Sequence, residues 1–169
     1  NEFTAKDIAI ITRHLLQDFP ETLDYTNKAS AVFESKSGGP ATMYSTNWLL
    51  AGMPYEKVGV DGLKTGTTDL TSAVKSEYGL SGAAISDKWI ASYNSKYAVA
   101  VWYGYKELNK DNYLTGADGS FKTVFQAIAK AAYTEKSSFA EGRNTSVHQY
   151  CRKRRKPLCP RLMALTQSQ

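Results

Sequence analysis

Apolar residues recur at helical spacing near the start of the chain, at Ile8, Ile11, Leu15 and Leu16. Thr4 and Asp7 stand just before and within this run in the pattern of a capping box, and Pro20 ends it. Because residues three and four positions apart share one face of a helix, the pattern predicts a helix over residues 4–18. A short helical turn is expected at residues 21–25.

Two stretches in the middle of the chain have the composition of β-strands. Residues 88–93 and 97–103 are rich in Trp, Tyr, Val and Ile, and an Asn-Ser pair separates them, which predicts an antiparallel hairpin in the centre of a sheet. Weaker strand patterns occur at residues 31–34 and 58–68, and the second of these contains glycines that suit a close approach of another backbone or a ligand. Residues 69–86 are polar and are expected to form a long loop.

A second amphipathic helix is predicted over residues 119–134, after a polar loop at 106–118. Its apolar face consists of Phe121, Val124, Phe125, Ile128 and Ala132, and Asp118 or Ser120 is available as a cap. The order of elements is helix, short strands, hairpin and helix. This order predicts the α+β class, with helices packed against an antiparallel sheet.

Charge divides the chain into two unequal parts. The net charge is +5, yet residues 1–142 carry all 16 acidic side chains and 14 basic ones, and only residues 143–169 are strongly basic. We therefore expect a domain over 1–142 and a basic tail without stable structure over 143–169. The basic run 152–156 could bind nucleic acid or anionic lipid, but a solvated tail is the simpler interpretation and nucleic acid is not expected as a partner.

Few residues suit metal or cofactor chemistry. The chain has two histidines and two cysteines, and their spacing is not that of metal ligands. His14 is expected on the surface of the first helix. Cys151 and Cys159 could close a small loop in an oxidising compartment or remain free thiols. No phosphate-binding glycine motif is present, so neither a metal nor a cofactor is predicted. No run of about 18 apolar residues, the length needed to cross a bilayer, occurs either.

One short motif carries a specific chemistry. Lys64-Thr65-Gly66-Thr67 follows Val-Asp-Gly-Leu and precedes Thr68-Asp69. With the first helix, this context resembles the serine D-alanyl-D-alanine carboxypeptidases among the penicillin-binding proteins over residues 1–70, in which Lys-Thr-Gly lies on an edge strand. Residues 67–135, with the aromatic hairpin, resemble class A penicillin-binding transpeptidases instead. Recombination, engineering and divergence within one family all remain open as origins of such a mosaic, and residues 143–169 match neither group.

The resemblance implies a role for each residue of the motif. Lys64 would supply positive charge and help to move a proton to the leaving group. Thr65 and Thr67 would offer hydroxyls to the carboxylate of the substrate or β-lactam, and the N–H of Thr67 would serve the oxyanion hole. Gly66 would allow the substrate to pair alongside the strand. Thr68 completes the expected substrate-binding set.

The nucleophile motif of the family, Ser-x-x-Lys, is missing from its expected place. The sequence Ser72-Ala-Val-Lys75 follows Lys-Thr-Gly instead of preceding it, and the Ser-x-Asn pattern at 45–47 and 92–94 is also out of position. We interpret these matches as coincidences. The aromatic residues of the hairpin could line a groove, but a packed core is the more ordinary role for alternating aromatics in strands.

The resemblance therefore implies the C-terminal part of a serine β-lactamase-like or penicillin-binding transpeptidase domain. Such a part would act in extracytoplasmic peptidoglycan synthesis, at the cell wall or cell membrane, on stem peptides or β-lactams. It would be inactive as an isolated chain, and a missing N-terminal half of the domain would be its partner. The alternatives are a non-catalytic binding module and a nucleic-acid or membrane-surface binder that acts through the basic tail.

Overall fold

The computed structural model describes residues 2–36, 38–56, 59–117, 119–133 and 161–168. The first helix, α1 (Ala5–Asp18), begins after Thr4, whose hydroxyl accepts from the Asp7 N–H at 3.2 Å while the Asp7 carboxylate accepts from the Thr4 N–H at 2.8 Å. The predicted helix and capping box are thus confirmed. A 3₁₀ turn, η1 (Pro20–Thr22), and the short helix α2 (Leu23–Thr26) form the predicted helical turn.

The main sheet carries its strands in the order β3-β4-β5-β7, with β6 paired to β4. These strands are β3 (Gly62–Asp69), β4 (Ala84–Tyr93), β5 (Tyr97–Gly104), β6 (Leu114–Thr115) and β7 (Arg161–Ser168). The pairs β3–β4 and β4–β5 are antiparallel, which confirms the predicted central hairpin, whereas β5–β7 is parallel.

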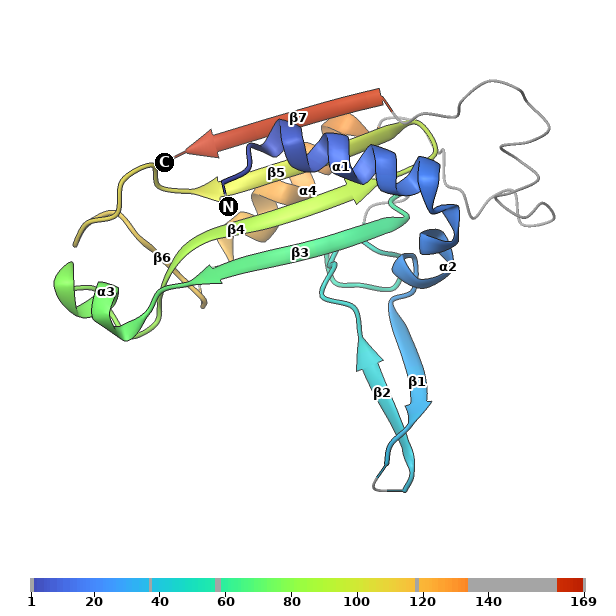
Figure 1. Cartoon of the computed structure of the whole chain (residues 1–169), viewed down its shortest axis with the longest axis horizontal. Helices are drawn as coiled ribbons and strands as arrows, with labels where there is room; N and C mark the ends of the chain where they lie inside the picture. The colour runs from blue at the N-terminus through green and yellow to red at the C-terminus, as the bar shows by residue number, and fades with distance from the viewer. Residues whose placement is uncertain (1, 37, 57–58, 118, 134–160, 169) are drawn as a thin grey trace.

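A separate hairpin projects from the body of the molecule (Figure 1). It consists of β1 (Ser30–Glu34), as the sequence predicts, and β2 (Pro40–Tyr44), which the sequence analysis missed. Nearly all of its side chains are exposed, including those of Val32, Met43 and Tyr44. Because neither face of the hairpin is buried, β2 has no alternation of apolar and polar residues that could have predicted it.

Two helices cover opposite faces of the main sheet, α1 on one and α4 (Ser120–Ala132) on the other (Figure 1). Small residues face α1, where Ala5 and Ala9 pack on Ala100 of β5. Larger side chains on the other face form the main core with α4, and they include Leu49, Ile90, Val99, Val101, Phe121 and Phe125. The structure thus has the predicted α+β class, with helices flanking the sheet. Among the described residues, no helix combines the length and apolar character needed to cross a membrane.

The region between β3 and β4 differs from the predicted loop over 69–86. It contains the helix α3 (Ser72–Glu77), whose cap Thr71 accepts from the Val74 N–H at 3.3 Å, and β4 already begins at Ala84. The threonine cap supplies the local reason for this short helix, since it satisfies one of the otherwise unpaired N–H groups of its first turn.

The start of α4 also differs from expectation. Its N-cap is Gly119 without a side-chain hydrogen bond, and neither of the two predicted caps fills that position. The Ser120 hydroxyl instead contacts the Tyr103 hydroxyl at 3.2 Å, and Asp118 lies outside the described residues.

Strand β7 belongs to the segment 143–169, for which the sequence predicted no stable structure. It runs beside β5 with Tyr97 opposite Arg161 and Gly104 opposite Ser168. The pairing satisfies backbone groups at an edge of β5 that would otherwise need another partner. The basic run 152–156 and both cysteines lie outside the described residues.

Candidate functional site

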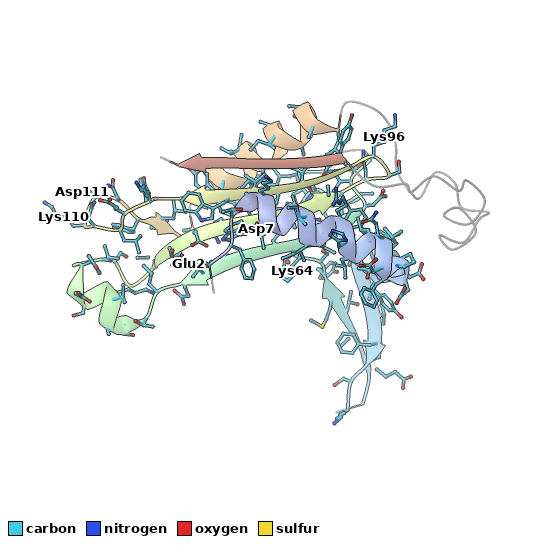
Figure 2. All side chains as sticks on the ribbon, turned by 45° about the horizontal axis from the view of Figure 1, so that its top comes forward. Glu2, Asp7, Lys64, Lys96, Lys110 and Asp111 are labelled. Carbon is cyan, nitrogen blue, oxygen red and sulfur yellow. The ribbon has the colours of Figure 1, made fainter. Side chains whose placement is uncertain are left out.

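The Lys-Thr-Gly motif lies on β3, at the edge of the main sheet. Among the described residues β3 pairs with β4 alone, so its other edge is open. Lys64 is exposed on this strand (Figure 2), whereas Thr65 is buried and Gly66 is half-buried. The motif therefore stands on an edge strand, as expected, and its lysine is accessible.

The side chains of the motif divide between the two faces of the sheet, as the alternation of a β-strand requires. A Cβ on Gly66 would lie 3.4 Å from Cβ of Trp89, which packs with the α1 face. Thr67, one position on, contacts Lys88 on the α4 face. By this alternation Lys64 shares the α1 face with Gly66, while Thr65 and Thr67 share the other. The structure thus does not bring the Lys64 amine and the two hydroxyls together on one face.

Lys64 itself contacts the backbone of its own strand. Its amine donates a hydrogen bond to the carbonyl oxygen of Thr65. Its register partner on β4 is Ala91, a small residue. The amine is therefore held along the strand by a neutral acceptor, and its positive charge is not cancelled by that contact.

Thr65 joins the motif to the loop before it. Its hydroxyl donates to Thr46, at 2.7 Å to Oγ1 and 3.3 Å to the carbonyl oxygen. Within this loop the Ser45 hydroxyl accepts from the Asn47 N–H at 3.1 Å, and the buried Asn47 side chain accepts from the Leu49 N–H at 3.1 Å. The pattern Ser45-Thr-Asn47 thus shapes a turn. Its contact with Thr65 was not foreseen from the sequence.

Thr67 has a lysine as its neighbour across the strand pair. Nζ of Lys88 donates to Oγ1 of Thr67 at 2.9 Å, and it lies 4.7 Å from the centroid of the Phe121 ring. Burial, together with the nearby charge of Lys122, lowers the pKa of Lys88. The sequence analysis missed Lys88, although its position two residues before Ile90 places both side chains on the same face of β4.

Thr68 binds a carboxylate on β4. Its hydroxyl donates to Oδ1 of Asp87 at 2.7 Å, and the Ser86 hydroxyl donates to the other carboxylate oxygen at 2.9 Å. In this conformation Thr68 stabilises the β3–β4 pair.

The out-of-order Ser-x-x-Lys sequence lies on α3, not in the expected loop. Ser72 is exposed in the first turn, and Lys75 donates to the Asp69 carboxylate at 3.2 Å and to the Gly82 carbonyl at 2.8 Å. The hydrogen bond from Lys75 holds the pKa of Asp69 below its usual value. Helix α3 lies beyond the end of β3 that is remote from Lys64 (Figures 1 and 2). The structure therefore does not place Ser72 beside the Lys-Thr-Gly lysine.

The second Ser-x-Asn sequence, at residues 92–94, is part of the core and a turn. The Ser92 hydroxyl contacts the Tyr133 hydroxyl at 2.7 Å, and both residues are buried. The Asn94 side chain accepts from the N–H groups of Lys96 and Tyr97 at 2.8 and 2.7 Å. This side-chain turn closes the β4–β5 hairpin.

The aromatic residues of the hairpin are packed, which confirms the core interpretation. Tyr93 and Tyr103 are fully buried, and the others are half-buried, among them Trp89 and Trp102.

His14 is exposed on α1, as predicted. Among the described residues no group of three or more His, Cys, Asp or Glu side chains is arranged to hold a metal.

Comparison with known proteins finds a family model that matches the N-terminal part of the chain. Residues 1–77 match the family model described as D-alanyl-D-alanine carboxypeptidase, and this stretch includes all of α1 and β3. This segment is therefore similar to the D-alanyl-D-alanine carboxypeptidases. The predicted resemblance is thereby confirmed over the N-terminal part of the chain, whereas the resemblance of residues 67–135 to class A transpeptidases stays a prediction.

A solved structure of a penicillin-binding protein is also similar. It is described as a peptidoglycan synthesis regulatory factor (PBP3) from Streptococcus pneumoniae and is 25% identical, with a TM-score of 0.47. The match covers 76% of this chain and 30% of that one. The chain thus spans less than a third of the length of this similar protein.

Proposed function

We propose that the chain contributes the Lys-Thr-Gly strand of a penicillin-binding, serine-type D-Ala-D-Ala peptidase or transpeptidase. The observation that carries this proposal is the match of residues 1–77 to the carboxypeptidase family, within which Lys64 stands exposed on an open edge strand. The reaction would belong to extracytoplasmic peptidoglycan synthesis, at the cell wall or membrane, and its ligands would be stem peptides or β-lactams.

The open edge of β3 suits the binding of an extended peptide. A substrate strand can pair with the backbone of such an edge, and Gly66 has no side chain that would obstruct the approach of the two backbones. Lys64 provides a cation for the terminal carboxylate and for proton transfer to the leaving group, and the Thr67 N–H provides an oxyanion donor. The hydroxyls of Thr65 and Thr67 lie on the other face of the strand, where they contact Thr46 and Lys88, so they would bind the same carboxylate only after a change in the conformation of the strand.

The acyl-enzyme needs a serine that another segment supplies. Ser72 lies beyond the far end of β3, and the amine of Lys75 already binds Asp69 and Gly82. A segment carrying Ser-x-x-Lys and Ser-x-Asn in the family order is therefore the expected partner. Without it the chain binds a carboxylate weakly and forms no covalent adduct.

Fluorescent penicillin labelling tests the proposal. The chain alone should give no adduct that survives denaturation, whereas co-expression with a segment carrying Ser-x-x-Lys and Ser-x-Asn should restore labelling. Lys64→Met should abolish the restored labelling, and Lys130→Met, an exposed change on α4, should preserve it.

Two results would contradict the proposal. An adduct on the isolated chain, lost in Ser72→Ala, would show that the α3 serine is the nucleophile. A complex that forms without labelling would favour the alternative of a non-catalytic binding module.

A further inference from the structure

Lys88 is a buried cation on the α4 face of the sheet. Its residue is 8% exposed, and among the described residues its amine makes one hydrogen bond, to Oγ1 of Thr67. An ammonium group has three protons to donate, so this bond leaves donor capacity unused. Within the part of the chain that the structure describes, no acidic side chain lies within ion-pair distance of Lys88. Such burial is unfavourable unless an anion compensates the charge.

A second cation, the Lys122 amine, lies near the Phe121 ring that also contacts Lys88. Nζ of Lys122, on α4, lies 5.9 Å from the centroid of the Phe121 ring, and Nζ of Lys88 lies 4.7 Å from the same centroid. Lys122 is further held at 5.4 Å from Trp48 and 5.9 Å from Tyr55. It too lacks an acidic partner among the described residues. Because both amines lie near the same ring, their like charges repel each other, and the charge of Lys122 contributes, after burial, to the lowered pKa of Lys88.

We propose that Lys88, Lys122 and the Thr67 hydroxyl form a binding site for a small oxyanion, a carboxylate or a phosphate group. The anion would accept the unused protons of the Lys88 amine and neutralise the repulsion between the two lysines. The Thr67 hydroxyl accepts from Lys88 and keeps its own proton to donate to the same anion.

This site is distinct from the Lys64 side of the motif. Lys88 and Thr67 lie on the α4 face of the sheet, whereas Lys64 shares the α1 face with Gly66. The site requires neither an acylating serine nor Lys64. It goes beyond the proposed peptidase function, because a chain that never reacts with penicillin would still possess it.

Titration of the isolated full chain with sodium phosphate, and separately with sodium acetate, tests the site. Amide resonances are followed by NMR at constant ionic strength and constant pH. At least one of the two anions should saturate shifts centred on Thr67, Lys88 and Lys122. Lys88→Met and Lys122→Met should each raise the dissociation constant by at least about tenfold, the loss of one charge-assisted hydrogen bond. Lys130→Met, on the same helix as Lys122, should leave it unchanged.

Several outcomes would overturn the proposal. One is saturation of the same shifts, with the same dissociation constant, in both lysine variants. Another is binding that Lys64→Met abolishes while Lys88→Met does not, and a third is the absence of saturable shifts with both anions. Lys122 is only half-buried, so its variant keeps the test valid if Lys88→Met fails to fold. Penicillin labelling has no part in this measurement, so the two proposals can fail separately.

Discussion

Lys88 donates a hydrogen bond to Thr67 across the β3–β4 pair, with 2.9 Å between Nζ and Oγ1. The same amine lies over the Phe121 ring of α4. This relationship connects the Lys-Thr-Gly strand at the sheet edge to the core beneath α4. The position of the Thr67 hydroxyl therefore depends on a buried charge as well as on the strand.

The free energy of unfolding of the parent protein should increase with pH in the alkaline range, and Lys88→Met should abolish this increase. Burial, and secondarily Lys122, holds the pKa of Lys88 below 10.5. Between that lowered pKa and 10.5 the unfolded chain binds a proton that the folded chain does not, so the free energy of unfolding increases with pH. Urea unfolding from about pH 8 to about pH 10 should show the increase in the parent protein and in Lys130→Met. An equal increase in Lys88→Met would contradict the assignment.

Tyr133→Phe should destabilise the fold by about 1–3 kcal/mol, because the buried Ser92 hydroxyl loses its partner at 2.7 Å. Burial also raises the pKa of Tyr133. Adding Ser92→Ala should recover part of the loss, since no unpaired hydroxyl then remains. Urea unfolding of the single and double variants measures both effects. Tyr78→Phe, at an exposed tyrosine, is the matched control, and losses of equal size in both tyrosine variants would refute the account.

Gly62→Ala should destabilise the start of β3 by about 1–3 kcal/mol, the usual range for overpacking. A Cβ at this position would lie 2.6 Å from Cζ of Tyr93, whose ring is fully buried against Leu16 and Leu23. The Tyr93 hydroxyl is also within 2.5 Å of the Thr26 hydroxyl, so the ring has little freedom to move.

Gly82→Ala is the control for this substitution, because no atom lies within 4 Å of its added Cβ. Its melting temperature should remain close to that of the parent protein. The packing argument fails if thermal unfolding shows the two alanine variants to be equally stable.

The Asp7 carboxyl should titrate below 3.8 in the folded protein. Its pKa is lowered first by the hydrogen bond from the Thr4 N–H and then by the Thr4 hydroxyl. The capping interaction is therefore fully present above pH 3.8 and is lost as the pH falls through the lowered pKa. In a ¹³C NMR titration, Thr4→Ala should move the Asp7 pKa upward, whereas Thr123→Ala on α4 should not. An unchanged Asp7 titration in Thr4→Ala would exclude the hydroxyl contribution.

Local signals predicted the elements that are stabilised locally. The capping box of Thr4 and Asp7 placed α1, and the aromatic and β-branched composition around Asn94 placed β4 and β5. Helix α3 was missed because its six residues lack an apolar face long enough to show a period, although Thr71 was available as a cap. Strand β2 was missed because both of its faces are exposed.

The sequence predicted the residues of the motif, but it did not predict the residues that contact them. The motif itself, from Lys64 to Thr68, was found because its residues are adjacent in the sequence. Thr46 and Lys88 approach Thr65 and Thr67 only through the fold, from 19 and 21 residues away. Contacts of this kind depend on strand register, and register follows from the packing of the whole sheet rather than from a local pattern.

The β1–β2 hairpin stands apart from the sheet, and its turn contains Gly38 and Gly39, both at positive φ and with open space around them. An exposed loop tip of this kind is where a protease nicks a folded chain. A nick there would separate α1 and α2 from β3 in sequence while leaving their packing intact. The turn is therefore the natural place to divide the gene for a split reporter, with α1 on one fragment and the Lys-Thr-Gly strand on the other.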